Sequence, residues 1–242
     1  MKMKPFVYAG PSWAKRSFDD PAKSIEISNL AKEWELPYFS CAEEGSNNLQ
    51  QVQYVKTTPT DLPIIWVMCE PLVELTIPDD ILSRSNLYRV HRKKALIKKY
   101  LRTPDHLSVR QIINFEQLSA MNALNRPIGL IGGHSDIQDS DITFFKNITI
   151  IDHSWQNFLA KLAGIDYNQY NFGFEISHRI LHGNHDITPS DKLINDIYQG
   201  LEFWKLLEEK NLFYQVHPNR VATEEYAKYL KDKVIEFIEK NS

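Results

Sequence analysis

The chain has 242 residues, of which 43% are hydrophobic and 24% charged, and its 28 basic and 31 acidic residues give a formal charge of −3. This near-neutral composition is typical of a globular protein and argues against a nucleic-acid partner. No apolar run approaches the roughly 18 residues of a membrane span, and the opening Met-Lys-Met-Lys leads into a short apolar stretch instead of a signal-peptide core. We therefore expect a soluble cytoplasmic protein with no membrane partner.

The chain contains two cysteines, Cys41 and Cys69. Two isolated cysteines do not make a disulfide framework, and no Cys-x-x-Cys pair indicates zinc. We expect each cysteine to be a small buried hydrophobic residue. The sequence therefore predicts no cofactor.

Apolar stretches alternate with helix-like segments along the chain, which is typical of a parallel sheet covered by helices. The expected strands are Phe6–Ala9, Pro37–Cys41, Pro63–Cys69, Ile128–Ile131 and Ile148–Ile151. The third is nearly continuous apolar sequence, as in a central strand that is buried on both faces. The predicted fold class is α/β, a three-layer α/β/α sandwich around a central parallel sheet of about five strands.

Helix signals occupy the segments between and after these strands. Asp20-Pro21 suits a helix start and predicts a helix that runs through Trp34. The other helices are expected over Asn47–Lys56, from about Asn86 to Leu101, over Ser108–Leu124, from Ser154, over Ser190–Lys210 and from near Thr223. No Pro/Gly/Ser-rich linker divides these elements. We expect residues 1–242 to form one domain, with a helical insertion at about 72–125.

Candidate functional residues follow the predicted strands, because open parallel sheets bind ligands beyond the carboxyl ends of their strands. The segments at these ends are Gly10-Pro11-Ser12, Glu43–Asn47, Cys69-Glu70-Pro71 and Gly132–Asp136. One further segment, Val216-His217-Pro218-Asn219, stands immediately before the last predicted helix. Its histidine is therefore expected in a loop and not on an apolar helix face.

Together these segments resemble the SGNH (GDSL-type) hydrolase superfamily. Gly10-Pro11-Ser12 is similar to the family's Gly-Asp-Ser block, Gly45 to the glycine of its second block, and His217-Pro218-Asn219 to the end of its Asp-x-x-His-Pro-Asn block. The matching order spans nearly the whole chain. The resemblance implies a flavodoxin-like SGNH-hydrolase fold and a serine esterase or acyl hydrolase that uses a Ser12–His217 pair on a small ester or acylated substrate.

The chain departs from this family at three positions. Pro11 replaces the Asp of the first block, and Tyr214 stands where the family has its triad Asp. Near Cys69 and Glu70 the Asn of the family's Gly-x-Asn-Asp block is missing. The resemblance therefore implies a Ser–His pair whose orienting acid and one oxyanion donor are lost or replaced.

The roles implied for these residues follow from elementary chemistry. A serine hydroxyl needs a base within hydrogen-bond reach, and His217 is the candidate base for Ser12. The backbone N–H groups of Ser12 and Gly45 would donate to the developing oxyanion. Candidates for the substrate pocket are Asn47, Glu70, His134 and Tyr214.

Several alternatives stay open from the sequence. Glu70 either replaces the missing acid or pairs with a basic residue downstream, and Asp136 or Asp152 are further candidates for that acid. The family's crevice could also serve a catalytically degenerate protein that binds a small ligand, a glycan or a protein partner. His178, His182 and His185 with Asp186 could hold a transition metal, although solvated histidines at helical spacing are common, and we expect no metal.

The segment Arg89–Arg102 carries seven basic residues interleaved with apolar ones at near-helical spacing. This pattern predicts an amphipathic helix with a cationic face. Such a face could bind phosphates or nucleic acid, could simply be solvated, or could guide an anionic substrate to a pocket near Glu70.

Overall fold

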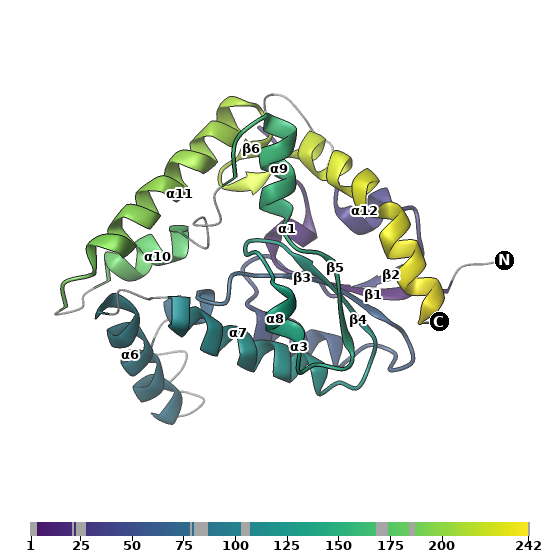
Figure 1. Cartoon of the computed structure of the whole chain (residues 1–242). Helices are drawn as coiled ribbons and strands as arrows, with labels where there is room; N and C mark the ends of the chain where they lie inside the picture. Colours follow the sequence, from purple (N-terminus) through teal and green to yellow (C-terminus); the bar gives the residue numbers. More distant parts are fainter. Residues whose placement is uncertain are drawn as a thin grey trace.

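The structure, a computed structural model, describes residues 4–20, 22, 28–77, 79, 87–102, 107–167, 174–183 and 187–241. Its centre is a five-stranded parallel sheet with the order β2-β1-β3-β4-β5 (Figure 1). The strands are β1 (Phe6–Ala9), β2 (Tyr38–Ser40), β3 (Ile64–Met68), β4 (Ile128–Gly132) and β5 (Ile148–Asp152). The predicted three-layer fold and all five predicted strands are confirmed.

The strand order places a topological switch point between β1 and β3. These strands pair in parallel, with Val7 opposite Ile64 and Ala9 opposite Trp66. In sheets of this order the chain leaves neighbouring strands toward opposite faces at the switch point, which opens a crevice beyond their carboxyl ends. Ser12 follows β1 and Cys69 follows β3, so both candidate segments lie beside this crevice.

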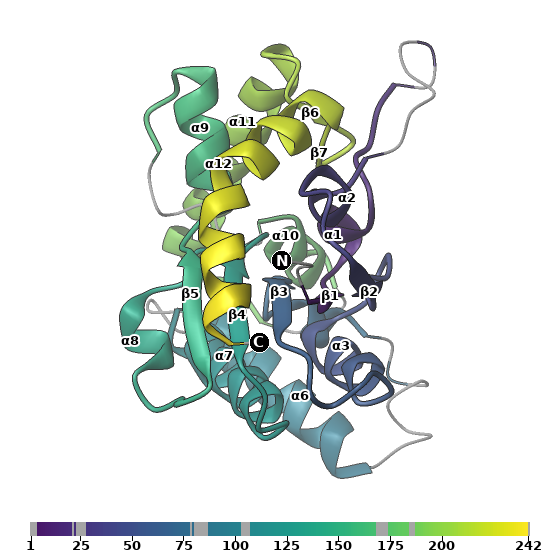
Figure 2. The same ribbon diagram turned by 90° about the vertical axis from the view of Figure 1, so that its right-hand side faces the viewer.

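Successive side chains of each strand enter two separate cores. Phe6 and Tyr8 pack against α2 (Leu30–Glu33), α9 (Trp155–Ala163) and α12 (Arg220–Lys240). Val7 and Ala9 belong to the opposite core, with α3 (Asn48–Val55) and α7 (Leu107–Asn122). Figure 1 shows the two helix layers on either side of the sheet, and Figure 2 shows α12 alongside β5. Alternate residues of a strand point to opposite faces of the sheet, and both faces are covered by helices. The strand β3 is therefore apolar along its whole length.

A second group of helices lies beside the sheet, on the left in Figure 1. It contains α6 (Leu87–Arg102), α10 (Phe174–Leu181) and α11 (Asp191–Glu209), and the short α4 (Val73–Thr76) contacts both α6 and α10. A single turn of helix, α8 (Asp139–Ile142), precedes β5. None of the described helices is both long enough and apolar enough to cross a lipid bilayer.

Several predicted boundaries need correction. The last helix begins at Arg220, three residues before the predicted start, because the Asn219 side chain accepts a hydrogen bond from Ala222 N and caps it. Cys69 is buried as predicted, but Cys41 is partly exposed because it follows the edge strand β2. The helix predicted from Asp20 to Trp34 also needs correction: in the described part of this segment it begins only at Leu30, because Asn29 is extended and its side chain caps α2 by accepting from Lys32 N at 2.9 Å. Residues 21 and 23–27 lie outside the described residues.

Candidate functional site

Ser12 lies at a sharp turn from strand to helix at the carboxyl end of β1. It is the first residue of α1 (Ser12–Lys15), whose Ala14 N and Lys15 N donate to Pro11 O at 2.9 and 3.0 Å. The turn requires glycine at position 10, because a Cβ there would lie 2.4 Å from the Cβ of Ala14. Gly10-Pro11 therefore brings helix and strand into close contact and presents Ser12 at the switch point.

His217 is held in a two-stranded antiparallel hairpin that the sequence did not predict. The strands β6 (Phe213–Tyr214) and β7 (His217–Pro218) are joined by Gln215 and Val216, both at positive φ, 47° and 60°. Such angles suit a two-residue hairpin turn but are unfavourable for a β-branched valine. Trp13 Nε1 donates to Val216 O at 3.2 Å and ties this turn to α1. The surrounding contacts thus maintain a strained turn directly before His217.

The structure brings Ser12 and His217 together. His217 Nε2 lies 2.9 Å from Ser12 Oγ, and His217 Nδ1 lies 2.5 Å from the backbone oxygen of Gln215. A carbonyl oxygen only accepts, so Nδ1 carries the proton and Nε2 is left to accept from the hydroxyl. Phe18 stacks on the imidazole at 3.8 Å between ring centres. The ring therefore has the tautomer and orientation of a general base, with a backbone carbonyl in contact with Nδ1.

The side chains considered as the missing acid are engaged elsewhere. Tyr214 pairs with His217 through the backbone of the hairpin, and its hydroxyl accepts from Gln215 Nε2 at 3.4 Å. Asp136 accepts from the Tyr167 hydroxyl at 2.9 Å, and Asp152 accepts from Tyr226 at 2.7 Å. Gln215 O therefore takes the place that the resemblance assigned to an acid.

A cavity of about 1100 Å³ opens at this end of the sheet. Its lining includes Ser12 and His217 and four further residues that the sequence suggested, namely Gly45, Asn47, Glu70 and His134. Tyr214 is not among the described residues that line it. The cavity thus brings together residues that follow β1, β3 and β4 and residues of the C-terminal hairpin.

Gly45 lies in a turn that is fastened to the strand before Ser12. Ser46 N donates to Glu43 O at 3.3 Å to close the turn, and Glu43 N donates to Gly10 O at 3.0 Å. Gly45 has a φ of +69°, a conformation that glycine adopts without the steric cost of a side chain. Turn geometry alone therefore accounts for a glycine at this position beside the cavity.

Asn47 is oriented by the helix that it caps. Its Oδ1 accepts from Gln50 N at 2.9 Å, and Gln50 Oε1 accepts from Asn47 N at 2.9 Å, which completes a capping box at the start of α3. The residue is 6% exposed. Because Oδ1 is held by the helix, Nδ2 is left as a donor, and it bonds to no residue that the structure describes. A side-chain amide donor from a largely buried residue thus lines the cavity.

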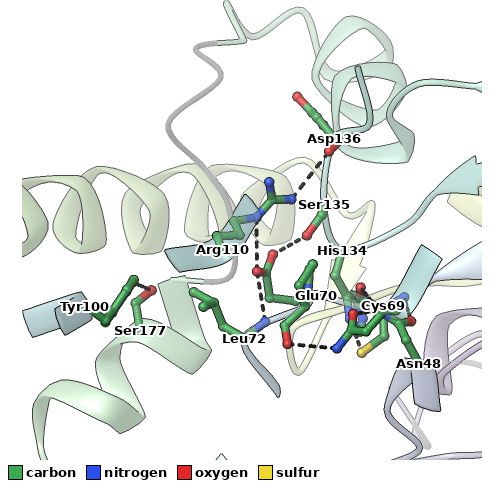
Figure 3. A network of polar contacts seen from close by, with 12 residues as sticks. Asn48, Cys69, Glu70, Leu72, Tyr100, Arg110, His134, Ser135, Asp136 and Ser177 are labelled. Atoms are coloured by element: carbon green, nitrogen blue, oxygen red, sulfur yellow. Dashed lines mark hydrogen bonds and ion pairs between the residues drawn. The ribbon is translucent and has the colours of Figure 1, made fainter. Parts of the chain in front are cut away.

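Glu70 is almost fully buried, at 1% exposure, and it lies in a network of polar contacts (Figure 3). Arg110 Nε binds one carboxylate oxygen at 3.1 Å, and the Ser135 hydroxyl donates to the other. Leu72 N also donates to Glu70, at 3.3 Å. Of the two interpretations of Glu70, pairing with a downstream basic residue is the one observed. The pairing neutralises a carboxylate that would otherwise repel an oxyanion.

His134 and Cys69 form a neutral pair in the cavity wall. His134 Nδ1 lies 3.5 Å from Cys69 Sγ, and the imidazole packs edge-on against Trp13 at 4.4 Å between ring centres. Burial, together with the nearby His217, lowers the pKa of His134 to about 3. Burial also raises the pKa of the Cys69 thiol. At neutral pH this pair therefore offers no thiolate nucleophile.

The lowered pKa of His134 predicts acid sensitivity of the fold. A histidine in the unfolded chain titrates near about 6.5, so below that pH the unfolded chain binds a proton that the folded chain does not. We expect the free energy of unfolding to fall by about 1–2 kcal/mol between pH 7 and pH 5. His134→Gln should remove this decrease in urea titrations, whereas His91→Gln on the exposed surface should retain it. Parallel pH profiles for wild type and His134→Gln would contradict this prediction.

The proposed metal ligands are only partly described. The rings of His178 and His182 lie 4.1 Å apart, whereas His185 and Asp186 lie outside the described residues. Over the ranges that the structure describes, no group of three or more His, Cys, Asp or Glu side chains could hold a metal ion.

The site also uses groups that sequence patterns do not reveal. The Gln215 carbonyl has no sequence signal, because every residue carries one, and Arg110 is one of 28 basic residues. Comparison with known proteins does not add to this picture: the sequence matches no family model and no curated protein.

Proposed function

We propose that the protein is a serine esterase or acyl hydrolase of the SGNH type. The observation that supports this most directly is the 2.9 Å contact between Ser12 Oγ and His217 Nε2 at the switch point of the sheet, on the wall of a large cavity. A serine and a histidine in this relation form the catalytic pair of acyl-transfer enzymes on several unrelated folds. Ser12 is the nucleophile, and His217 is first the general base and then the general acid.

The reaction proceeds in two displacement steps. Ser12 Oγ attacks the ester carbonyl carbon while its proton passes to His217 Nε2, and the resulting tetrahedral intermediate expels the alcohol, which takes that proton from His217. Water then attacks the acyl-Ser12 ester, and His217 again accepts a proton. When this second intermediate collapses, the acid is released and the proton returns to Ser12 Oγ. The Gln215 carbonyl holds the imidazole in place through both steps.

Asn47 complements the backbone donors at the oxyanion. Ser12 is the first residue of α1, so its N–H points away from the helix without an intrahelical partner. The Gly45 turn is tied to Gly10 O, two residues before Ser12. Asn47 follows this turn, and its Nδ2 is the side-chain donor that the altered Cys69-Glu70 segment lacks. Donors directed at the developing charge lower the barrier because they need no reorganisation.

Asn47→Ser separates the oxyanion role from the capping role. Serine caps helices about as well as asparagine, so stability should stay within about 0.5 kcal/mol of wild type. Loss of the amide donor should lower kcat for an activated ester by about 100-fold. The matched control is Asn29→Ser, which alters the exposed cap of α2 and should not affect turnover. Equal kcat values for Asn47→Ser and wild type would exclude Asn47 from the oxyanion site.

Labelling with a fluorophosphonate probe tests the proposed function directly. Only a serine that is activated by a base reacts quickly with such a probe, so wild type should gain one adduct, located on Ser12 by peptide mass spectrometry. Ser12→Ala should not react. Ser140→Ala, which removes an exposed hydroxyl from α8, should react like wild type. No adduct on wild type, or undiminished labelling of Ser12→Ala, would refute the proposal.

The alternative is a ligand-binding protein without turnover. The contact of His217 Nδ1 with a carbonyl favours it, because a carbonyl stabilises an imidazolium less than a carboxylate does. That alternative predicts saturable binding of an ester, measured by calorimetry, with no release of alcohol from wild type. The hydrolase predicts release that stops in Ser12→Ala.

A further inference from the structure

The cavity has a second chemically distinct region, built by helices beside the sheet. Whereas Ser12 and His217 come from the sheet end and the hairpin, Arg89 comes from α6 and Arg179 from α10, and both arginines line the same cavity. Arg89 also borders a smaller adjoining pocket of about 90 Å³, which it shares with Glu74 and Leu49. The two arginines belong to separate helices, so it is the tertiary structure that places both in the lining of one cavity.

The carboxylates that line the cavity already form ion pairs or hydrogen bonds with other side chains. Glu44 pairs with Arg16 at 2.7 Å and Glu70 with Arg110 at 3.1 Å. Glu74 accepts a hydrogen bond from Gln117 at 3.3 Å. The cavity carboxylates are therefore held by partners other than Arg89.

Two neighbouring basic residues of α6 form ion pairs with carboxylates. Arg92 pairs with Glu116, and Lys93 pairs with Asp79 at 2.9 Å. Within the described parts of the chain no carboxylate forms an ion pair with Arg89. Its guanidinium is a fork of donors on the cavity wall, and a planar anion is its natural ligand.

Apolar side chains also line the cavity that holds Ser12 and Arg89. They come from α3, α4, α10 and the segment after α4, and they are Leu49, Val73, Ile176 and Ile77. Such walls favour methylene groups and disfavour additional polar groups in a ligand. A ligand that fits both regions therefore has an ester at one end, an apolar chain, and an anionic group at the other end.

We propose that the cavity selects esters whose acyl chain ends in an anionic group, with the ester at Ser12 and His217 and the anion held by Arg89. This inference rests on the proposed function, because it names the substrate class of the same site. It also gives the cationic segment of α6 a specific role, because one of its arginines recognises the substrate.

Matched ester pairs test this inference. The probes are p-nitrophenyl monoesters of α,ω-dicarboxylic acids and the p-nitrophenyl esters of unbranched fatty acids of the same chain lengths. Wild type should favour the anionic member in kcat/KM at the chain length that spans the cavity. In Arg89→Gln the ratio of anionic to neutral kcat/KM should fall about tenfold, as for a lost charge-assisted hydrogen bond. Arg89→Glu should reverse the preference.

Two controls keep the outcomes distinct. Lys98→Gln removes the same charge from an exposed position of α6 outside the cavity lining, and its ratio should equal that of wild type. Calorimetric binding of the same ester pairs to Ser12→Ala measures selection without turnover, and Arg89→Gln in that background should weaken binding of the anionic member about tenfold.

Results for the two proposals can be separated. Equal ratios in wild type, Arg89→Gln and Lys98→Gln, with esters hydrolysed, would overturn the substrate class and leave the hydrolase intact. Preferential binding of anionic esters to Ser12→Ala, with no hydrolysis by wild type, would support the substrate class and refute the hydrolase. Absence of preference in both turnover and binding would overturn the inference in either case.

Discussion

His217→Ala is expected to lower kcat for a p-nitrophenyl ester by about 1,000-fold, within the range measured for loss of a general base. Without the imidazole the Ser12 proton has no acceptor at 2.9 Å, and the hydroxyl is a weak nucleophile at neutral pH. KM should change little, because His217 contributes to proton transfer more than to substrate binding. The measurement is release of p-nitrophenolate under saturating ester, compared with Ser12→Ala.

Two further measurements separate a chemical role of His217 from a structural one. Added imidazole should restore part of the activity of His217→Ala, because the vacated space lies beside Ser12 in an open cavity, but it should not restore Ser12→Ala. His91→Ala, an exposed histidine of α6, is the matched control and should retain wild-type kcat. Turnover of His217→Ala at the wild-type rate would show that hydrolysis does not use this pair.

Arg110→Met is expected to reduce the free energy of unfolding by about 3–5 kcal/mol, because it leaves the Glu70 carboxylate buried without its counter-charge. Arg110 is 8% exposed and Glu70 1%, so both members of the pair are largely shielded from solvent. Ser135 and Leu72 N would still donate to the carboxylate, but neither carries a charge. The loss is a large part of the roughly 5–15 kcal/mol that stabilises a typical domain. Urea unfolding followed by circular dichroism measures it.

Removing both members of the ion pair should cost less than removing one. Arg110→Met combined with Glu70→Leu eliminates the isolated charge, so we expect the double variant to regain most of the lost stability. Arg102→Met, the same replacement at the exposed end of α6, should change stability by no more than about 0.5 kcal/mol. If Arg110→Met were as stable as Arg102→Met, the pair would contribute nothing to the fold.

Side-chain pattern was sufficient to predict the sheet. The five strands were recognised because buried parallel strands read as short apolar runs that end at turn residues, and β3 illustrates this over Ile64–Met68. Two helices, α9 and α11, are predicted for a similarly local reason: Ser154 and Ser190 each accept a hydrogen bond from the third residue of the helix that follows. These features can be predicted from the sequence because they depend on contacts between residues that are close in the chain.

Short elements near the site were not predicted, because their stability comes from distant partners. The β6–β7 hairpin has Gln215 and Val216 in its turn, neither of which signals positive φ, and it depends on the bond from Trp13 to Val216 O. The helix α1 has four residues and is too short to form alone. In both cases the sequence carries no periodic pattern long enough to be recognised.

Residue chemistry in the sequence already indicated which groups belong to the site. Six site candidates line the cavity, namely Ser12, Gly45, Asn47, Glu70, His134 and His217, whereas the candidate Tyr214 is not among its described lining residues. That inference was possible because parallel strands place their carboxyl ends at one edge, so the residues after them converge. The order of strands along the chain therefore predicts where a site lies, even though it does not predict which side chains contact each other there.

How those groups are paired depends on the folded chain. Ser12 and His217 are 205 residues apart, and Arg110 is 40 residues from Glu70, so no local pattern predicts either contact. The partner of His217 Nδ1 is a backbone oxygen, which is common to all residues and is selected only by the strained turn that presents it. Hydrogen bonds and ion pairs act over a few ångströms, so their partners follow from the packing of helices and strands and not from residue type.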